Sequence, residues 1–207
     1  MSDPAPQLVG LSPTMKRVAA SLRRSLKAIY HVHPAHDDEE MAATAEKLSE
    51  LMSAAGSMGL GQSSDVRYTR SPLSGPFNPI APPVTYEYGE NSISAKVLFN
   101  ESYQGPPACV HGGMVAALLD DALGRTRHLT GRNCVTGGLN ITYKRPTPIN
   151  ADLTVEARIE SVHERKFIVT GEIYHDGKVT ASAEAVFVFL ADEKFNALVS
   201  DARDASR

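Results

Sequence analysis

The sequence predicts an α+β protein in which an antiparallel β-sheet wraps around one central helix, preceded by a helical extension. Two patterns carry this prediction. Apolar residues recur at helical spacing twice before residue 57 and once more over Gly113–His128. Around that last segment the pattern changes to a period of two, which is typical of strands with one buried face. Two such segments before the helix and four after it favour a sheet curved around the helix.

The N-terminal part of the chain is expected to form two amphipathic helices. The first is expected to begin at Ser12-Pro13, an N-cap followed by proline, and the second to run from Asp37 or Asp38 to Gly56. Residues 56–83 are rich in Gly, Ser and Pro, which predicts a connection along the surface. We therefore expect a helical extension over residues 1–70, a main domain over 71–192 and a C-terminal tail over 193–207.

Strands account for most of the main domain. We expect two before the central helix, over residues 84–88 and 92–99, and four after it, over 135–143, 153–159, 167–174 and 179–190. Asp176-Gly177 joins the last two strands and predicts a type I′ turn. The central helix is largely apolar, so we expect it to be buried.

Composition excludes several classes of protein. The 42% hydrophobic and 22% charged content is that of a soluble globular protein, and no segment approaches the ~20 apolar residues that span a bilayer. A net charge of -3 gives no long-range attraction to nucleic acid or to an anionic membrane. Cys109 and Cys134 are too few for a disulfide framework and lack zinc-ligand spacing. We expect an untargeted protein of the reducing cytoplasm, without metal or cofactor.

His111-Gly112-Gly113 stands where the chain leaves a loop and begins the central helix. The first backbone N–H groups of a helix have no intrahelical partner and carry the positive end of its dipole. Glycines there let a carbonyl group approach the backbone closely, so the motif is a candidate oxyanion site for acyl transfer. The same glycines are also compatible with tight packing alone.

Asp120 is the second candidate catalytic group. It stands among alanines and leucines, and burial of a carboxylate on such a helix would raise its pKa and suit it to nucleophilic or general-base catalysis. A solvated or paired surface carboxylate is the alternative. Asp121 fits that alternative, because an i,i+4 pair with Arg125 explains it.

The two candidate groups cannot touch the same carbonyl from one helix. Gly112 and Asp120 are eight residues apart, which corresponds to about 12 Å along the helix axis. If both act in one site, Asp120 comes from a second copy of the helix, packed antiparallel to the first. We therefore expect a homodimer, or a dimer of such dimers, with composite active sites.

Two segments closely resemble the hotdog-fold acyl-CoA thioesterases of the PaaI type. They are Gly105–Gly113 followed by Asp120, and Asn140–Pro146. The segment Asn78–Pro83 is also similar to bacterial members of that group. The resemblance covers residues 77–190 and leaves the N-terminal helices outside. Many relatives have glycine at the position of Ala108, so a slightly different loop path is expected here.

The resemblance implies a hotdog fold and the hydrolysis of acyl-CoA to a free acid and coenzyme A. It implies that the Gly112 N–H polarises the thioester carbonyl, and that Asp120 of the other subunit acts as nucleophile or as base for water. His111 matches the histidine that orients the loop or assists at the carbonyl. Thr136 falls where related enzymes place a hydroxyl near the attacking group, although threonine is also common in strands.

Coenzyme A carries phosphates, which need cations at the mouth of the pocket. Lys144 and Arg145 follow the strand after the helix, and Arg165 and Lys166 stand at an expected strand turn. Ordinary surface charge explains each of them equally well. The other predicted substrate-binding residues, which belong to the matched motifs, are Gly113 and Asn140.

Other functions compete with this one. A cysteine hydrolase would pair Cys109 or Cys134 with His111, but no orienting Asn or Asp is evident, and the G-x-S-x-G motif of serine hydrolases is absent. Histidines 31, 33 and 36 precede four acidic residues and suggest either a metal site or, as we expect, a solvated loop.

Two further alternatives share the fold. One is a hotdog dehydratase or hydratase, whose motifs are not found here, and the other is a non-catalytic acyl-CoA-binding protein, which would not need Asp120. The first N-terminal helix is rich in Lys and Arg but shows no helix-turn-helix pattern, so we interpret it as a lid or packing element. The preferred acyl chain and the choice between dimer and tetramer stay open.

Overall fold

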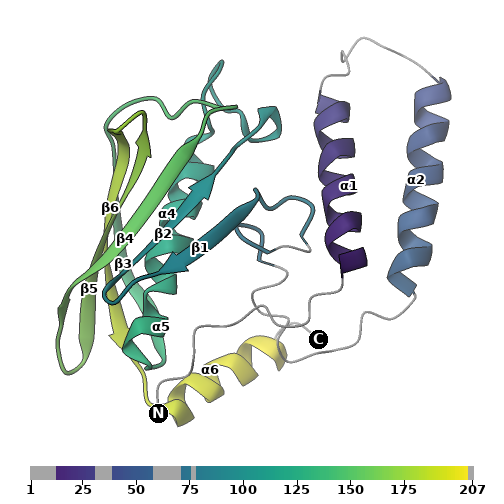
Figure 1. The fold of residues 1–207 in the computed structure, drawn as a ribbon. Coiled ribbons are helices and arrows are strands. Elements are labelled where there is room, and N and C mark those ends of the chain that lie inside the picture. Colours follow the sequence, from purple (N-terminus) through teal and green to yellow (C-terminus); the bar gives the residue numbers. More distant parts are fainter. Residues whose placement is uncertain (1–12, 31–38, 58–70, 76–77, 205–207) are drawn as a thin grey trace.

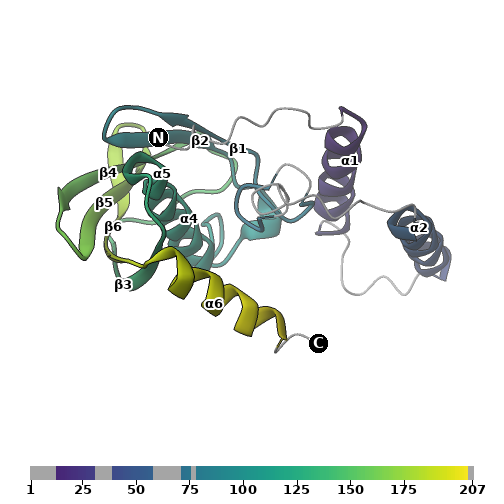
Figure 2. The same ribbon diagram turned by 90° about the horizontal axis from the view of Figure 1, so that it is seen from below.

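Two helices form the N-terminal part of the protein, as the sequence predicts. The computed structural model describes residues 13–30, 39–57, 71–75 and 78–204. Helix α1 spans Pro13–Tyr30 and α2 spans Glu39–Ser57. Figure 1 shows the two helices beside one another, and Figure 2 shows that α2 lies beyond α1 as seen from the sheet.

A single antiparallel sheet dominates the rest of the chain, and all the predicted strands are confirmed. Its strand order is β1-β2-β4-β5-β6-β3, so β1 and β3 form the two edges. Both residues of the Asp176-Gly177 turn have positive φ, 47° and 69°, as a type I′ turn requires. The strand bounds are Val84–Tyr88 (β1), Ser92–Val97 (β2), Cys134–Tyr143 (β3), Leu153–Val162 (β4), Lys166–His175 (β5) and Lys178–Phe189 (β6).

Helix α4, Gly112–Arg125, packs against one face of this sheet and forms the core with it (Figure 1). Leu118, Leu119 and Leu123 have no exposed surface, and each stabilises the fold by about 2 kcal/mol through burial. Gly171 lets the helix approach the sheet, because a Cβ there would lie 3.2 Å from the Leu123 side chain and 3.0 Å from the Glu156 carbonyl oxygen. The sequence therefore predicts the hotdog arrangement of one helix wrapped by one sheet correctly.

The central helix is shorter and less buried than the sequence analysis predicts. It ends at Arg125, and the Thr126 hydroxyl donates a 2.6 Å hydrogen bond to the Leu123 carbonyl oxygen. The short helix α5, Arg127–Thr130, follows and stops at Gly131, which has a φ of 62°. One side of α4 is open in the single chain and carries small or polar residues, namely Gly113, Ala116, Ala117, Asp120 and Gly124.

The C-terminal segment forms a helix where the sequence analysis expects a tail. Helix α6 spans Asp192–Asp204 and begins with two acidic residues, which interact favourably with a helix N-terminus. Its few apolar side chains, such as half-buried Phe195 and exposed Leu198, are too sparse to give a clear period in the sequence. No helix among the described residues is long and apolar enough to cross a membrane.

Helix α1 is attached to the main domain through a short loop region. Ala19 of α1 is buried, and α1 contacts the 3-10 helix η1, Glu101–Tyr103. Arg23 donates from Nε to the Ala81 carbonyl oxygen at 2.9 Å. The Tyr103 hydroxyl donates to the neighbouring Ile80 carbonyl oxygen at 2.9 Å. One face of α1 is therefore packed against the segment that leads toward α4.

Candidate active site

The loop before α4 is a compact turn that delivers His111 to the start of the helix. The Gly105 N–H donates to the Cys109 carbonyl oxygen, and the Cys109 N–H donates to that of Pro106, both at 2.9 Å. A Cβ on Gly105 would lie only 2.8 Å from the Cα of His111, so the close approach requires glycine. The His111 N–H donates to the Tyr103 carbonyl oxygen at 2.8 Å, which fixes the last residue of the loop.

Ala108, in the middle of this loop, has left-handed backbone angles with a φ of 60°. A residue with a Cβ adopts this conformation at a cost of about 1 kcal/mol, whereas glycine adopts it freely. The alanine at this position, where many relatives have glycine, predicts a slightly different loop path. The alanine here adopts the conformation that a glycine would favour, and it does so under strain.

The first turn of α4 leaves one backbone donor available. The Gly113 N–H donates to Nδ1 of His111 at 3.0 Å, and the Met114 and Val115 N–H groups donate to the His111 carbonyl oxygen at 2.8 and 3.2 Å. Among the described residues, none accepts a hydrogen bond from the Gly112 N–H. Because Nδ1 of His111 accepts, the neutral ring carries its proton on Nε2. His111 is thus the N-cap of α4, and Gly112 presents the N–H at the positive end of the helix.

Tyr143, at the end of β3, is a residue of the site that the sequence analysis does not single out. Its hydroxyl donates to the Gly112 carbonyl oxygen at 2.9 Å, and its ring lies 3.6–3.7 Å from the position of a Cβ on Gly112. Tyr143 pairs across the sheet with buried Ala181, so it lies on the face that carries the core. The period-two pattern of β3 places Tyr143 on the same face as Ile141, and this was the available signal.

Asp120 lies on the open side of α4 and is exposed in the single chain. Of the two possibilities that the sequence leaves open, the single chain therefore shows the solvated carboxylate, because only the opposite side of the amphipathic helix contacts the sheet. Its pKa is nevertheless raised, first by partial desolvation and second by the negative charge of Asp121. Asp120 thus keeps the perturbed acidity expected of a catalytic carboxylate, on a surface that a second molecule can cover.

Asp121 is held in a half-buried polar network, and its predicted pair with Arg125 is confirmed. Nε of Arg125 donates to Oδ2 of Asp121 at 2.9 Å, and the Tyr86 hydroxyl donates to the same oxygen at 2.9 Å. The Arg125 guanidinium also lies 4.3 Å from the centre of the Tyr86 ring and donates to the Ser74 hydroxyl. The network fixes β1 and residues 71–75 to the C-terminal half of α4.

Thr136 and Asn140 lie on opposite faces of β3. Thr136 pairs with buried Phe187 and so lies on the core side of the sheet, whereas Asn140 pairs with exposed Glu184 on the outer side. An irregularity between Thr136 and Gly138 separates the two parts of the strand. The single chain therefore does not bring Asn140 to the start of α4.

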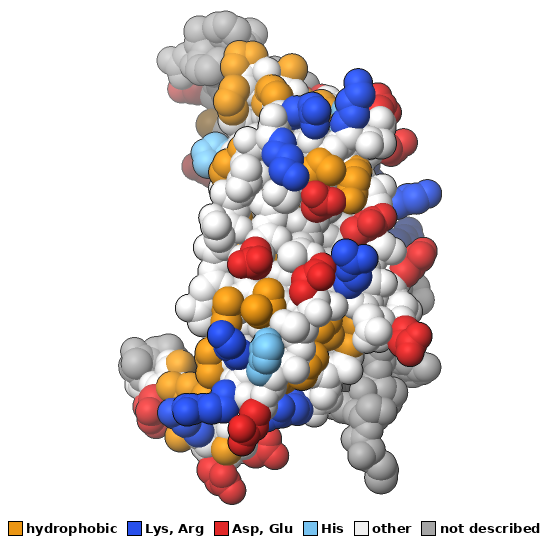
Figure 3. All heavy atoms as spheres, turned by 90° about the vertical axis from the view of Figure 1, so that its left-hand side faces the viewer, with side chains coloured by type: hydrophobic (Ala, Val, Ile, Leu, Met, Phe, Trp, Pro, Cys, Tyr) orange, Lys and Arg blue, Asp and Glu red, His pale blue; other side chains and the backbone are white. Residues whose placement is uncertain are grey.

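The four candidate cations form two separate groups. Lys144 and Arg145 follow Tyr143, near the start of α4, but Nζ of Lys144 lies 3.4 Å from Oε1 of Glu172 and Nη1 of Arg145 donates to the Val179 carbonyl oxygen at 2.8 Å. Arg165 and Lys166 lie at the turn between β4 and β5. In Figure 3, Lys and Arg side chains gather near both ends of the outer sheet face, and a few carboxylates are scattered between them.

Neither a cysteine hydrolase nor a metal centre has an assembled site in the described part of the chain. Cys134 is buried, which raises the pKa of its thiol and makes it unreactive, and Cys109 lies half-buried in the loop. No group of three or more metal-ligating side chains occurs among the described residues. The histidines at 31, 33 and 36 fall outside the described residues.

A sheet wrapped around one helix, with a capped His-Gly-Gly turn at the helix N-terminus, defines a protein of the hotdog class. A family profile described as the thioesterase superfamily matches residues 109–182. A crystal structure of a thioesterase superfamily protein is 30% identical to this chain, and the alignment covers 86% of this chain and 96% of that protein with a TM-score of 0.77. The chain therefore belongs to the thioesterase superfamily.

The curated relatives match a smaller part of the chain. The mouse (Mus musculus) acyl-coenzyme A thioesterase THEM4 is 33% identical over 87 residues, and the human (Homo sapiens) acyl-coenzyme A thioesterase THEM5 is 28% identical over 87 residues. These matches cover 42% of this chain but only 37% and 35% of the relatives. The chain thus spans little more than a third of the length of either relative.

Proposed function

We propose that this protein hydrolyses acyl-CoA thioesters to free acids and coenzyme A, in the cytoplasm. The observation that carries the proposal is the Gly112 N–H, the donor left available at the N-terminus of α4 when His111 accepts from its neighbours. Such a donor stabilises the oxyanion that forms when a thioester carbonyl is attacked. The names of the relatives, acyl-coenzyme A thioesterases, support acyl-CoA as the substrate.

In the proposed reaction, the thioester carbonyl oxygen accepts a hydrogen bond from the Gly112 N–H. Asp120 either removes a proton from a water molecule that attacks the carbonyl carbon, or attacks that carbon itself to form an acyl-aspartyl intermediate that water then hydrolyses. In both routes the carbon–sulfur bond breaks, and the departing coenzyme A thiolate receives a proton. Thr136 is a candidate donor to the attacking group, since it lies on the core side of β3.

The site is proposed to be complete only in a dimer. Gly112 and Asp120 are separated by about 12 Å along α4, so one thioester cannot contact both within one chain. The open side of α4 carries small residues that allow a second helix to approach closely, with Asp120 among them. An antiparallel copy of α4 would then place its Asp120 opposite Gly112.

The edge strand β3 supports the same assembly. Nine of its ten residues pair with β6, and its other side has no strand partner among the described residues. Val135, Leu139 and Tyr143 on this strand are 38%, 37% and 55% exposed. A long unpaired edge with exposed apolar side chains is a template for pairing with another strand. We propose that β3 pairs with β3 of a second subunit, which brings the two α4 helices together.

The oxyanion donor can be tested by deleting a single N–H group. Proline at Gly112 removes the donor but suits the first position of a helix, and His111 before it already has the extended ψ of 132° that proline requires. We expect Gly112→Pro to lower kcat for acyl-CoA about 100- to 1000-fold. Gly112→Ala keeps the N–H and is the matched control, because its Cβ meets only ordinary contacts with Tyr143. Equal activity of the two variants would exclude the proposed role of the N–H.

Thiol release from a panel of acyl-CoAs tests the activity itself. We expect hydrolysis by the wild type and its loss in Asp120→Asn. Tight binding of acyl-CoA without thiol release would instead indicate a binding protein, and proton exchange or hydration at the acyl chain would indicate a dehydratase or hydratase. Turnover that survives Asp120→Asn would contradict the assigned mechanism.

The composite site makes its own prediction. Subunits with Asp120→Asn and subunits with Gly112→Pro are both expected to be inactive alone, and mixed dimers are expected to regain activity because one of their two sites is intact. Leu139→Lys on the β3 edge is expected to give monomers in sedimentation experiments, whereas Leu98→Lys, at a position that is 41% exposed outside the proposed interface, is expected to leave the dimer intact. Inactive mixtures of exchanging subunits would rule out the cross-subunit arrangement.

A further inference from the structure

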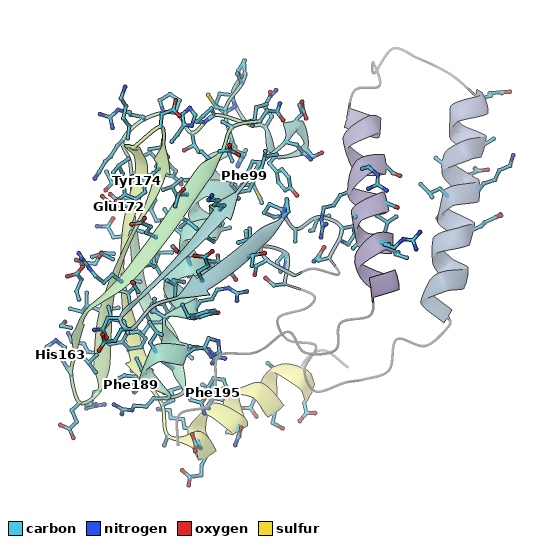
Figure 4. All side chains as sticks on the ribbon, viewed as in Figure 1. Phe99, His163, Glu172, Tyr174, Phe189 and Phe195 are labelled. Carbon is cyan, nitrogen blue, oxygen red and sulfur yellow. The ribbon has the colours of Figure 1, made fainter. Side chains whose placement is uncertain are left out.

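A cavity of about 800 Å³ lies at the end of the molecule where α4 stops, away from Gly112. It is bounded by α5, the residues before β3, the β4–β5 turn and the end of β6. Figure 4 shows Phe189 at this end of the sheet with His163 and Phe195 nearby, while Phe99 lies at the opposite end. The cavity is lined by three arginines, Arg127, Arg132 and Arg165, and by Phe189.

The lining of the cavity has an excess of cations over carboxylates, although the chain as a whole carries a net charge of -3. Its two acidic residues are Glu164 and Asp192, and Oδ1 of Asp192 accepts a hydrogen bond from the Asn133 side chain at 2.9 Å. Lys166, next to Arg165, begins β5 and adds a further cation close by. Guanidinium groups gathered around one cavity suit phosphate, because their N–H groups match its oxygens in pairs.

Arg132 is held in place before any ligand binds. Its guanidinium lies 3.5 Å from the centre of the Phe189 ring, and its Nη2 donates to the Glu164 carbonyl oxygen at 3.1 Å. A guanidinium fixed against an aromatic ring leaves its other face as a flat surface on which a nucleobase can stack. Arg165 is placed by its backbone, since its carbonyl oxygen accepts from the Phe189 N–H at 3.0 Å.

We propose that this cavity, defined by Arg127, Arg132, Arg165 and Phe189, binds a phosphorylated adenine nucleotide, namely the nucleotide end of acyl-CoA. The inference rests on the proposed function and extends it. Arg127 follows Asp120 by seven residues, which corresponds to about 10 Å if helical rise continues through α5. In a composite site, the cavity of the subunit that supplies Asp120 is therefore the one near the reacting thioester. The pantetheine arm of the substrate would connect the two places.

Direct binding measures the pocket without requiring turnover. Adenosine 3′,5′-bisphosphate, titrated calorimetrically into the full chain, is expected to bind the wild type. Arg165→Gln should weaken its binding at least about tenfold, because each charge-assisted hydrogen bond to phosphate contributes about that factor. Arg165 donates no side-chain hydrogen bond that the fold depends on among the described contacts. Arg158→Gln is the matched control, since Arg158 is paired with Glu160 on the outer sheet face. No binding to the wild type, or equal binding to both variants, would overturn the proposal.

Steady-state kinetics distinguish a loss of nucleotide binding, which raises KM, from a loss of the hydrolytic step, which lowers kcat. For acyl-CoA, Arg165→Gln and Arg132→Gln are expected to raise KM about tenfold and to leave kcat unchanged. For an S-acyl pantetheine, which lacks the nucleotide, neither substitution is expected to change KM. Equal changes for both substrates would overturn the pocket assignment, because they would indicate general damage. Unfolding temperatures of the variants identify such damage independently.

The two proposals fail in different ways. Acyl-CoA hydrolysis that is indifferent to Arg132 and Arg165 would refute the pocket and leave the hydrolase standing. Bisphosphate binding that is lost in Arg165→Gln, in a protein that releases no thiol from acyl-CoA, would support a nucleotide pocket and refute the hydrolase.

Discussion

The hydroxyl of Tyr143 donates a hydrogen bond to the carbonyl oxygen of Gly112 at 2.9 Å, and so connects the edge strand β3 to the first residue of α4. The peptide units on both sides of Gly112 then have defined positions, because His111 caps the next N–H. A donor whose direction is fixed before the substrate binds stabilises an oxyanion without reorganisation.

Tyr143→Phe removes this hydrogen bond and keeps the ring. We expect kcat for acyl-CoA to fall about fivefold with little change in KM, since one neutral hydrogen bond contributes about 1 kcal/mol. Steady-state kinetics measure the effect. Tyr174→Phe is the control, because it deletes a hydroxyl that bonds to Glu172 on another part of the sheet. A loss of kcat that is equal in both variants would refute a positioning role for Tyr143.

Arg23 is expected to stabilise the loop that holds His111. It anchors α1 to the Ala81 carbonyl oxygen, Tyr103 bonds the adjacent Ile80, and the Tyr103 carbonyl oxygen accepts from the His111 N–H. Arg23→Ala should lower the free energy of unfolding by about 1 kcal/mol and speed hydrogen exchange at His111.

Arg24→Ala is the matched control for this change, because Arg24 is exposed and bonds to Ser21 within α1. We expect it to leave exchange at His111 unaltered. Identical exchange in both variants would mean that α1 does not support the loop.

Ala108→Gly is expected to stabilise the protein by less than about 1 kcal/mol. The φ of 60° at Ala108 is strained for a residue with a Cβ, and the relief exceeds the extra chain entropy that glycine brings to the unfolded state. Chemical denaturation measures the difference. Ala117→Gly in α4 should destabilise by about 1 kcal/mol, because helical angles give glycine no such advantage. A loss of stability in Ala108→Gly would contradict the assignment of strain.

The elements of the main domain were predictable because each has a clear period or turn signal. The alternation along β4, β5 and β6 and the Asp176-Gly177 turn all appear in the structure. Helix α6 was missed, since its apolar residues are too few to define a face. The break after Arg125 was missed as well, because the Thr126 hydroxyl bond that ends α4 has no distinctive sequence signal.

The site was only partly predictable for a different reason. The His-Gly-Gly motif is local in sequence, so its position at a helix start could be predicted, and the structure adds that His111 caps the Gly113 N–H. Tyr143 reaches Gly112 only through the register of β3 with β6, which a single sequence does not give. The exposure of Asp120 likewise depends on which side of α4 the sheet covers.

The ionised Asp120, which we propose is needed for catalysis, should lower the stability of the folded protein at neutral pH. Its pKa is raised in the folded chain by partial desolvation and by Asp121, whereas an unfolded aspartate has a pKa of about 3.9. The folded state therefore binds the proton of Asp120 more tightly than the unfolded state does. The stability that this proton contributes is lost as the pH rises from the pKa of the unfolded state through the pKa of the folded state. We expect Asp120→Asn to be more stable than the wild type at pH 7 by less than about 1 kcal/mol, since solvent screens the exposed carboxylate.

At a pH well below the pKa of an unfolded aspartate, Asp120→Asn should no longer be more stable than the wild type. Denaturation at this low pH and at pH 7 measures the change in stability. Asp121→Asn is the contrasting control: it leaves the buried Arg125 without its carboxylate partner and should cost about 3 kcal/mol of stability at pH 7.

The raised pKa of Asp120 also predicts how activity depends on pH. Wild-type activity, which needs the ionised Asp120, should rise with pH through a midpoint above the ordinary aspartate range. A midpoint at or below that range, or destabilisation by Asp120→Asn at pH 7, would show that this carboxylate is not perturbed in the working protein.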